Sequence, residues 1–239
     1  MKYCFGVDIG GTTVKMGLFE ENGTIVDKWE ITTDTSEEGK AILPNVAASV
    51  EKKIEEHQIS KEDIKGIGVG VPAPVTADGV VNGSANLGWK YKEVRRELEE
   101  LTGLTAAVGN DANVAALGEM WKGGGAGEKN MIMVTLGTGV GGGVILDQKI
   151  VSGAHGLAGE IGHFHMRDEE KEHCNCGGTG CLEQVASATG IAREARRKMA
   201  SCETPSVLRE YGDKVTAKNV LDAAKAGDAL ADEVVEVVC

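Results

Sequence analysis

The sequence has few aromatic residues, a deficit of basic charge and no long apolar run. Phe, Trp and Tyr make up only 4% of the 239 residues, whereas 34 residues are glycine, so tight turns and close backbone approaches are expected. The formal net charge of −12 disfavours a nucleic acid partner. The most apolar stretch, residues 131–146, is too short and too rich in glycine to span a membrane.

Length and hydrophobic content set the scale of the fold. A chain of 239 residues, of which 41% are hydrophobic, can form one large domain or two modest ones with a proper core. The apolar strand pattern begins at Tyr3, without a signal-peptide pattern before it. We therefore expect a cytoplasmic, reducing compartment in which cysteines remain thiols.

One short segment is typical of a metal site. His163 is followed, after ten residues, by Cys174, Cys176 and Cys181. Three thiols and one imidazole complete a tetrahedral zinc site with no open position for a substrate, so the predicted Zn²⁺ is structural. His165 is the alternative imidazole, because in an extended segment it shares a face with His163.

Apolar patterns predict an α/β chain. Strands are expected over residues 3–8, 14–19, 24–32, 64–71 and 106–108, and helices over residues 37–57, 91–101 and 110–121. The glycine-rich segment 123–127 is the best candidate for a domain boundary. The predicted domains are therefore a small N-terminal domain, 1–122, and a larger one, 123–239.

A strand and glycine turn near the N-terminus recur in the second half. Residues 7–12 read Val-Asp-Ile-Gly-Gly-Thr, and residues 134–139 read Val-Thr-Leu-Gly-Thr-Gly; each is followed by two further strand patterns. This repeat predicts two similar domains with a ligand in the cleft between them. Chance similarity of a common strand–turn pattern is the alternative.

Residues 137–142 also match the dinucleotide pattern G-x-G-x-x-G. That pattern requires a helix after the glycines, whereas residues 144–146 read as a strand. We interpret this segment and residues 10–13 as two phosphate-binding turns. Asp8 precedes the first turn, where its carboxylate could hold Mg²⁺ directly or through water.

Asp111 stands at the predicted start of a helix, in the run Asn110-Asp111-Ala112-Asn113. Asn and Asp are favoured N-cap residues, and the helix dipole keeps such a carboxylate ionised. An ionised carboxylate can also orient a hydroxyl and accept its proton during phosphoryl transfer. Both interpretations are compatible.

Together, these motifs resemble the ROK sugar kinases, and among them the bacterial ATP-dependent glucokinases. The similarity runs from residues 8–12 through 110–113 and 136–139 to the segments 159–163 and 174–183. It implies an α/β fold of the two-domain actin/hexokinase (ribonuclease H-like) type with an interdomain cleft. It also implies ATP and Mg²⁺ as cofactors, transfer of phosphate to the 6-hydroxyl of glucose, and a homodimer.

The resemblance assigns a role to each candidate residue. Asp111 would be the catalytic base on the sugar 6-hydroxyl. His163 would place one ring nitrogen on zinc and the other toward the sugar, so that the metal sets its tautomer. The remaining sugar ligands would be Asn86, Asn110, Glu160 and Glu183, and the phosphate and Mg²⁺ ligands would be Asp8, Gly10, Gly11, Thr12, Thr13, Gly137, Thr138 and Gly139.

Two departures from the family accompany this resemblance. Ala73 replaces a usual second glycine. The family also continues past residue 239 into an adenosine-binding stretch, so we expect a truncated chain that binds ATP weakly and exposes an apolar stripe. That stripe is Leu230, Val234, Val237 and Val238.

Three alternative functions follow. The first is a kinase for another hexose or an N-acetylated amino sugar. The second is a sugar-sensing ROK protein without catalysis, although ROK repressors carry an N-terminal helix-turn-helix and Met1 lies almost in the first strand. The third is a zinc-stabilised interaction module, which the phosphate turns and carboxylates disfavour.

Overall fold

The computed structural model describes residues 1–154 and 156–238, and the chain divides into two compact units. Unit 1 comprises Met1–Ile132 and Gly143–Ala158, and unit 2 comprises Met133–Gly142 and Gly159–Cys239. Strands β8 (Met131–Leu136) and β9 (Val140–Leu146) therefore each contribute residues to both units. The predicted boundary between residues 122 and 123 divides the chain differently and stays a prediction.

A five-stranded mixed sheet forms the centre of unit 1, in the order β3-β2-β1-β4-β7. Strand β1 is antiparallel to β2 and parallel to β4, and β4 is parallel to β7. The strands predicted around residues 3–8, 14–19, 24–32 and 64–71 are all present. Their bounds are β1 Tyr3–Ile9, β2 Thr13–Glu20, β3 Ile25–Thr32, β4 Ile64–Val71 and β7 Ala106–Asn110.

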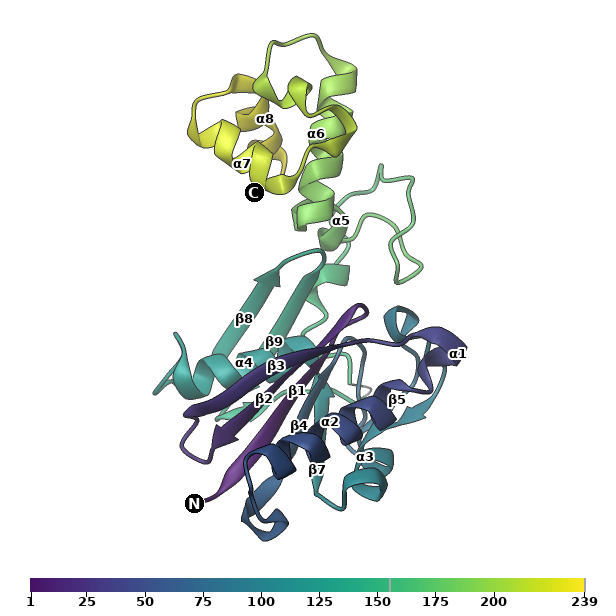
Figure 1. Cartoon of the computed structure of the whole chain (residues 1–239). Coiled ribbons are helices and arrows are strands. Elements are labelled where there is room, and N and C mark those ends of the chain that lie inside the picture. The colour runs from purple at the N-terminus through teal and green to yellow at the C-terminus, as the bar shows by residue number, and fades with distance from the viewer. Residues whose placement is uncertain (155, 239) are drawn as a thin grey trace. The chain divides into compact units, whose positions relative to one another are not determined.

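Helices α2 (Ile42–Glu56) and α3 (Val94–Thr102) cover one face of this sheet (Figure 1). Val46 of α2 and Leu98 of α3 are fully buried in the same core as Val69 of β4. Successive residues of a strand point to opposite faces, so Gly70 faces away from this core. Helix α4 (Asp111–Lys122) begins on that opposite face. A Cβ atom on Gly70 would lie 3.5 Å from the Cα atom of Asp111.

The helix predicted over residues 37–57 begins later than expected. Glu37 and Glu38 have φ angles of 47° and 61°, in the left-handed region that disfavours helix continuation. The segment therefore splits into the short α1 (Ser36–Gly39) and α2. The other elements of unit 1 are η1 Lys61–Asp63, β5 Val80–Val81, η2 Ala85–Leu87, β6 Lys92–Glu93 and β10 Lys149–Ile150, the last of which pairs with β9.

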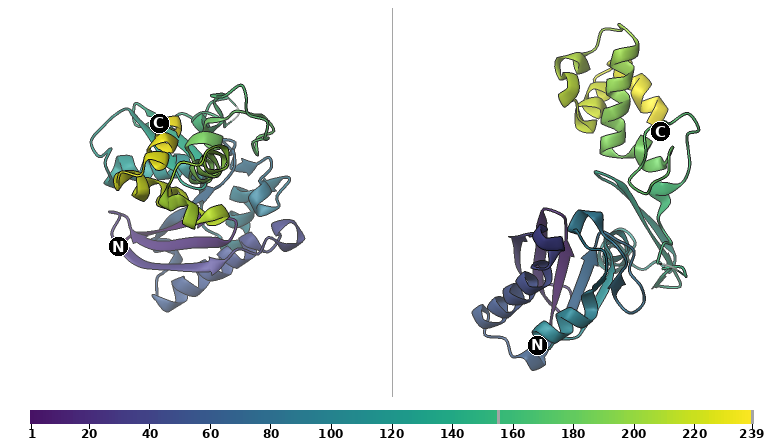
Figure 2. Two further views of the ribbon diagram at one scale, coloured as in Figure 1. Left: turned by 90° about the horizontal axis from the view of Figure 1, so that it is seen from above. Right: turned by 90° about the vertical axis from the view of Figure 1, so that its right-hand side faces the viewer.

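Unit 2 has a helical core of its own. Helices α6, α7 and α8 gather in one bundle, coloured green to yellow in Figures 1 and 2. The predicted exposed stripe is wrong for Leu230 and Val234, which are 0% and 1% exposed in this core, whereas Val237 is 48% exposed. The bounds are η3 Ile161–His163, α5 Leu182–Ala186, α6 Ala188–Ser201, η4 Val207–Glu210, η5 Gly212–Lys214, α7 Ala217–Lys225 and α8 Ala229–Val238.

Among the described residues, no helix combines the length and the apolar character that crossing a bilayer requires.

The packing of α8 gives a stability prediction. Leu230→Ala should lower the free energy of unfolding by about 2–5 kcal/mol, because it leaves a cavity in a closed core. Val237→Ala, on the exposed side of the same helix, should cost less than about 0.5 kcal/mol. Urea unfolding followed by circular dichroism measures both. Equal losses for the two variants would contradict the packing described for α8.

Candidate active site and metal centre

The four predicted metal ligands come together in unit 2. One ligand atom from each of His163, Cys174, Cys176 and Cys181 lies within 4.8 Å of all the others. The Sγ atoms of Cys176 and Cys181 are 3.6 Å apart, and Cys174 Sγ lies 3.6 Å from His163 Nδ1. Tetrahedral zinc with bonds of about 2.3 Å places its sulfur ligands about 3.8 Å apart. The cluster therefore has the dimensions of a zinc site.

The segment that carries the cysteines is folded by tight backbone turns, and the pKa of one of its thiols is shifted. The Cys174 amide donates to Gly178 O at 2.8 Å, and the Gly177 amide donates to Cys174 O at 2.9 Å, so the segment curls back on itself. Gly177 has a φ of +89°, which glycine adopts without strain. Burial, and next the neighbouring thiols, raise the pKa of Cys181 to about 12. A bound cation would favour the thiolate forms of these sulfurs, which are the forms that bind zinc.

The two candidate histidines have different partners. His163 turns Nδ1 toward Cys174, and its Nε2 lies 3.8 Å from Glu160 Oε2. His165 instead contacts Thr179 O through Nδ1 at 2.9 Å and Asp168 Oδ1 through Nε2 at 2.7 Å. The geometry therefore favours His163 as the fourth ligand. It also leaves one imidazole edge beside the Glu160 carboxylate, away from the thiols.

Glu183 joins the metal cluster to the turn Gly137–Gly139, which we call the glycine turn. Its Oε2 accepts a hydrogen bond from the Val140 amide at 2.9 Å, and its Oε1 lies 3.9 Å from Cys174 Sγ. A Cβ atom on Gly139 would lie only 2.3 Å from Oε2 of Glu183. Only a glycine at position 139 allows this approach.

A second group of predicted residues assembles in unit 1 around Asp111. Asp8 pairs with Gly70 in the register of β1 and β4, and a Cβ atom on Gly70 would meet both Asp8 Oδ1 and the Asp111 backbone within 4 Å. Asp111 is exposed, yet its pKa is raised, first by partial desolvation of its carboxylate and also by the charge of Asp8. The Ala112 amide donates to Asp111 Oδ1 at 2.8 Å and opposes this shift.

Asn110 caps the helix that carries Asp111. Its Oδ1 accepts from the Asn113 amide at 3.1 Å, and its Nδ2 donates to Ala73 O at 3.4 Å. The predicted N-cap is therefore confirmed. The Ala73 methyl group lies in the core, so the departure from glycine at this position is accommodated by packing.

The first predicted phosphate turn lies in the same unit. The Gly10 amide donates to Thr13 O at 3.0 Å, and the Thr33 hydroxyl donates to Gly10 O at 2.7 Å. A Cβ atom on Gly11 would come within 3.1 Å of Asn86 O, which places Asn86 beside the turn. The predicted residues thus form two sets, one in each unit, and the roles assigned to them stay predictions.

Sequence reasoning missed the start of α6. The Ala188 amide donates to Gly137 O at 2.8 Å, and the Thr189 hydroxyl donates to Thr138 O at 3.0 Å. These bonds fix the glycine turn from the helix side. The available signal was the N-cap residue Ser187, whose side chain accepts from the Gly190 amide.

Comparison with known proteins identifies the family. The sequence profile described as the ROK family matches residues 4–239. The chain belongs to the ROK family.

Two glucokinases are among its curated relatives. That of Halalkalibacterium halodurans is 48% identical over 239 residues, covering 98% of this chain and 72% of the relative. That of Thermotoga maritima is 37% identical over 233 residues, covering 95% of this chain and 71% of the relative.

A solved ROK structure has the same fold. The ROK glucokinase of Streptomyces griseus, determined in complex with glucose and AMPPNP, is 33% identical to this chain, with a TM-score of 0.76. The match covers 99% of this chain and 75% of that protein. The fold class predicted from the sequence is confirmed: an α/β chain of the two-domain actin/hexokinase type.

The metal cluster gives a second prediction. Elemental analysis of the purified protein should find one zinc ion per chain, and Cys176→Ser should lose it because three ligands hold zinc far less tightly than four. Cys202→Ser is the matched control, since Cys202 lies outside the cluster, and it should retain the metal. Wild-type protein without zinc, or equal loss in both variants, would contradict the metal site.

Proposed function

We propose that this protein is a glucokinase that transfers the terminal phosphoryl group of ATP to the 6-hydroxyl of glucose. Family membership, 48% identity to a glucokinase and the likeness to a structure holding glucose and AMPPNP support the proposal. The observation that carries it is the placement of Asp111, which opens α4 beside Gly70 and within the field of Asp8. Phosphoryl transfer to an alcohol uses such a carboxylate.

Asp111 acts as the general base in this proposal. Its raised pKa brings it closer to the range in which a carboxylate accepts a proton effectively near neutral pH. The transition state is loose, so its main contribution is to orient the sugar hydroxyl and to take its proton late in the reaction. The hydrogen bond from the Ala112 amide holds the carboxylate in place.

The remaining polar residues bind sugar and phosphate. We assign the other glucose hydroxyls to Asn86, Asn110, Glu160, His163 and Glu183. The turns Gly10–Thr13 and Gly137–Gly139 would present backbone amides and threonine hydroxyls to phosphate oxygens. Asp8 supplies a carboxylate that suits Mg²⁺, which would neutralise phosphate charge when bound.

Zinc has a structural role in this proposal. His163, Cys174, Cys176 and Cys181 would hold the ion with four protein ligands and leave no open position for a substrate. If Nδ1 of His163 held the metal, its Nε2 would carry the ring proton and would be placed to donate to a sugar hydroxyl beside Glu160. Reduced thiols at this site fit a cytoplasmic enzyme, and we propose a homodimer without a nucleic acid partner.

A coupled phosphorylation assay over a panel of sugars tests the function. We expect glucose to give the highest kcat/KM with ATP, above mannose, fructose and N-acetylglucosamine. A preference for N-acetylglucosamine would replace glucokinase by an amino-sugar kinase. Sugar binding without turnover of any panel member would favour a non-catalytic sugar sensor.

Replacement of the base gives the third prediction. Asp111→Asn keeps the shape of the side chain and leaves the Asn110 cap in place but cannot accept a proton, so kcat should fall by at least about a hundredfold, with a much smaller change in glucose affinity. Asp78→Asn, at an exposed turn of the same unit, should leave kcat unchanged. Turnover of a folded Asp111→Asn protein at the wild-type rate would exclude Asp111 as the base.

The pH profile gives the fourth prediction. A general base works in its ionised form, so kcat/KM should fall as the pH drops through the pKa of Asp111. Because that pKa is raised above 3.8, the loss should occur at a higher pH than an ordinary aspartate would produce. Initial rates of the wild type and of Asp78→Asn should show this acid limb. If the residual activity of Asp111→Asn fell over the same pH range, Asp111 would not be the base.

A further inference from the structure

The segment between the metal ligands folds onto helix α6 through charged side chains. We call residues 163–181 the metal loop. From the loop, Arg167, Glu170 and Glu172 meet Arg193, Glu194 and Arg197 of α6. The six side chains form a continuous ion-pair cluster, in which each loop residue has a partner of opposite charge on the helix.

Glu170 is the centre of this cluster. Its side chain is only 1% exposed. Arg197 donates to both carboxylate oxygens, through Nη1 at 2.8 Å and Nη2 at 2.9 Å, and Arg193 adds a bond at 3.2 Å. The Glu172 amide donates to Oε1 at 3.0 Å. These bonds hold the pKa of Glu170 at about 2, with the Arg197 hydrogen bonds as the largest cause.

Burying the Glu170 carboxylate costs free energy unless its charge is paired and its oxygens are hydrogen-bonded. A buried carboxylate loses its hydration, and only good geometry with further hydrogen bonds offsets that loss. The two-pronged contact of Arg197 provides this geometry and restricts orientation as well as distance. Removing the charge of Glu170 would leave Arg193 and Arg197 with only the exposed Glu172 as their shared acceptor on the loop, so the loop would be held less firmly on the helix.

Hydrogen bonds next to the ion-pair cluster also reach the cysteines and the glycine turn. Gln184 accepts from the Cys181 amide at 3.1 Å and donates to Glu172 O at 2.9 Å. At its N-terminus, α6 binds the glycine turn through Ala188 and Thr189. The ion-pair cluster therefore ties the metal loop to the helix that also supports the glycine turn.

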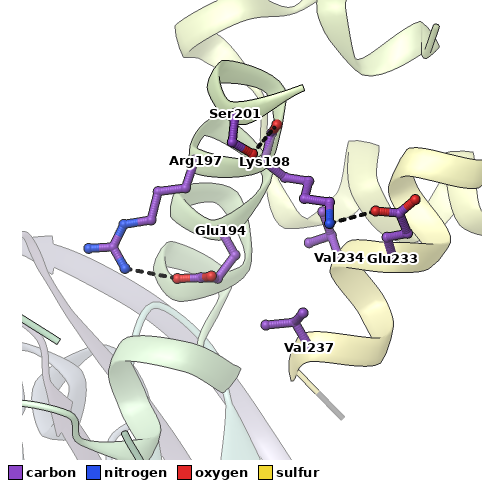
Figure 3. Close-up of a pocket in the computed structure, with 7 residues that line it drawn as sticks. All are labelled: Glu194, Arg197, Lys198, Ser201, Glu233, Val234 and Val237. Atoms are coloured by element: carbon purple, nitrogen blue, oxygen red, sulfur yellow. Dashed lines mark hydrogen bonds and ion pairs between the residues drawn. The ribbon is translucent and has the colours of Figure 1, made fainter. Parts of the chain in front are cut away.

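The position next to Arg197 on α6 has a different partner. Figure 3 shows Arg197 reaching Glu194 on its own helix, whereas the adjacent Lys198 pairs with Glu233 of α8. The Lys198–Glu233 pair, at 2.5 Å, joins two helices of the bundle and does not touch the metal loop. Glu233, on α8, is thus a matched control for the loss of an acidic partner of α6 outside the metal loop.

We propose that Glu170 is a positioning residue: clamped by Arg193 and Arg197, it holds the metal loop on α6 so that His163 and the three cysteines are assembled before zinc binds. The inference rests on the proposed zinc site. It assigns to Glu170 no contact with the metal. Its effect is on metal affinity, because a loop already in place loses less conformational freedom when the ion binds.

Zinc affinity of the otherwise intact protein tests the proposal. Competition with a chromogenic chelator should show that Glu170→Gln weakens zinc binding by about tenfold or more, the range for residues that support metal ligands. Glu169→Gln, an exposed neighbour in the same loop, and Glu233→Gln should bind zinc as the wild type does. Wild-type affinity in Glu170→Gln would overturn the proposal, and a wild type that binds no zinc would overturn both it and the metal site.

A double-mutant cycle tests whether Glu170 and Arg197 act on zinc affinity through one shared interaction. If the Glu170–Arg197 pair acts as a unit, Arg197→Gln should weaken zinc binding to a similar degree, and the double variant should be little worse than either single one. Additive losses would show that the two residues act independently and would overturn the clamp. Circular dichroism of the zinc-loaded variants confirms that affinities are compared between folded proteins.

Discussion

Close backbone approach at glycine is the constraint on which both groups of site residues depend. In unit 1 a Cβ atom on Gly10 would lie 2.9 Å from Thr13 O, and one on Gly11 would lie 3.1 Å from Asn86 O. Gly139 allows the Glu183 carboxylate to reach the Val140 amide. At Gly162 a Cβ atom would lie 2.1 Å from Val140 O, so the segment carrying His163 could not pack there with any larger residue. These glycines thus allow polar groups to approach the backbone closely rather than only forming turns.

The surroundings of each buried or partly desolvated carboxyl group set the direction in which its pKa shifts. The Asp8 and Asp111 carboxylates lie close enough for one to raise the pKa of the other, whereas Glu170, surrounded by guanidinium groups, has its pKa lowered. The first environment suits a group that exchanges a proton, and the second suits a group that stays ionised and holds structure. The pKa of a carboxyl group therefore shifts in opposite directions at the two places because its neighbours differ.

His163 links the two kinds of chemistry in unit 2. Its Nδ1 faces the thiols and its Nε2 faces Glu160, so a metal on one side would set the ring orientation and the tautomer on the other. The ion-pair cluster around Glu170 and the N-terminus of α6 act one step further out. They hold the loop and the glycine turn in place, and the proposal requires no contact between Glu170 and the metal.

The sequence alone determined the strands of the first sheet, the N-cap at Asn110, the clustered cysteines with two candidate histidines, and the family resemblance, because these depend on local pattern and spacing. Tertiary structure decided the rest. The expected helix over 37–57 broke at Glu37 and Glu38, and Leu230 was buried by α6 and α7 rather than exposed. The choice of His163 over His165 and the clamp on Glu170 depend on side chains far apart in the sequence, and no local pattern records which distant partner a charge will meet.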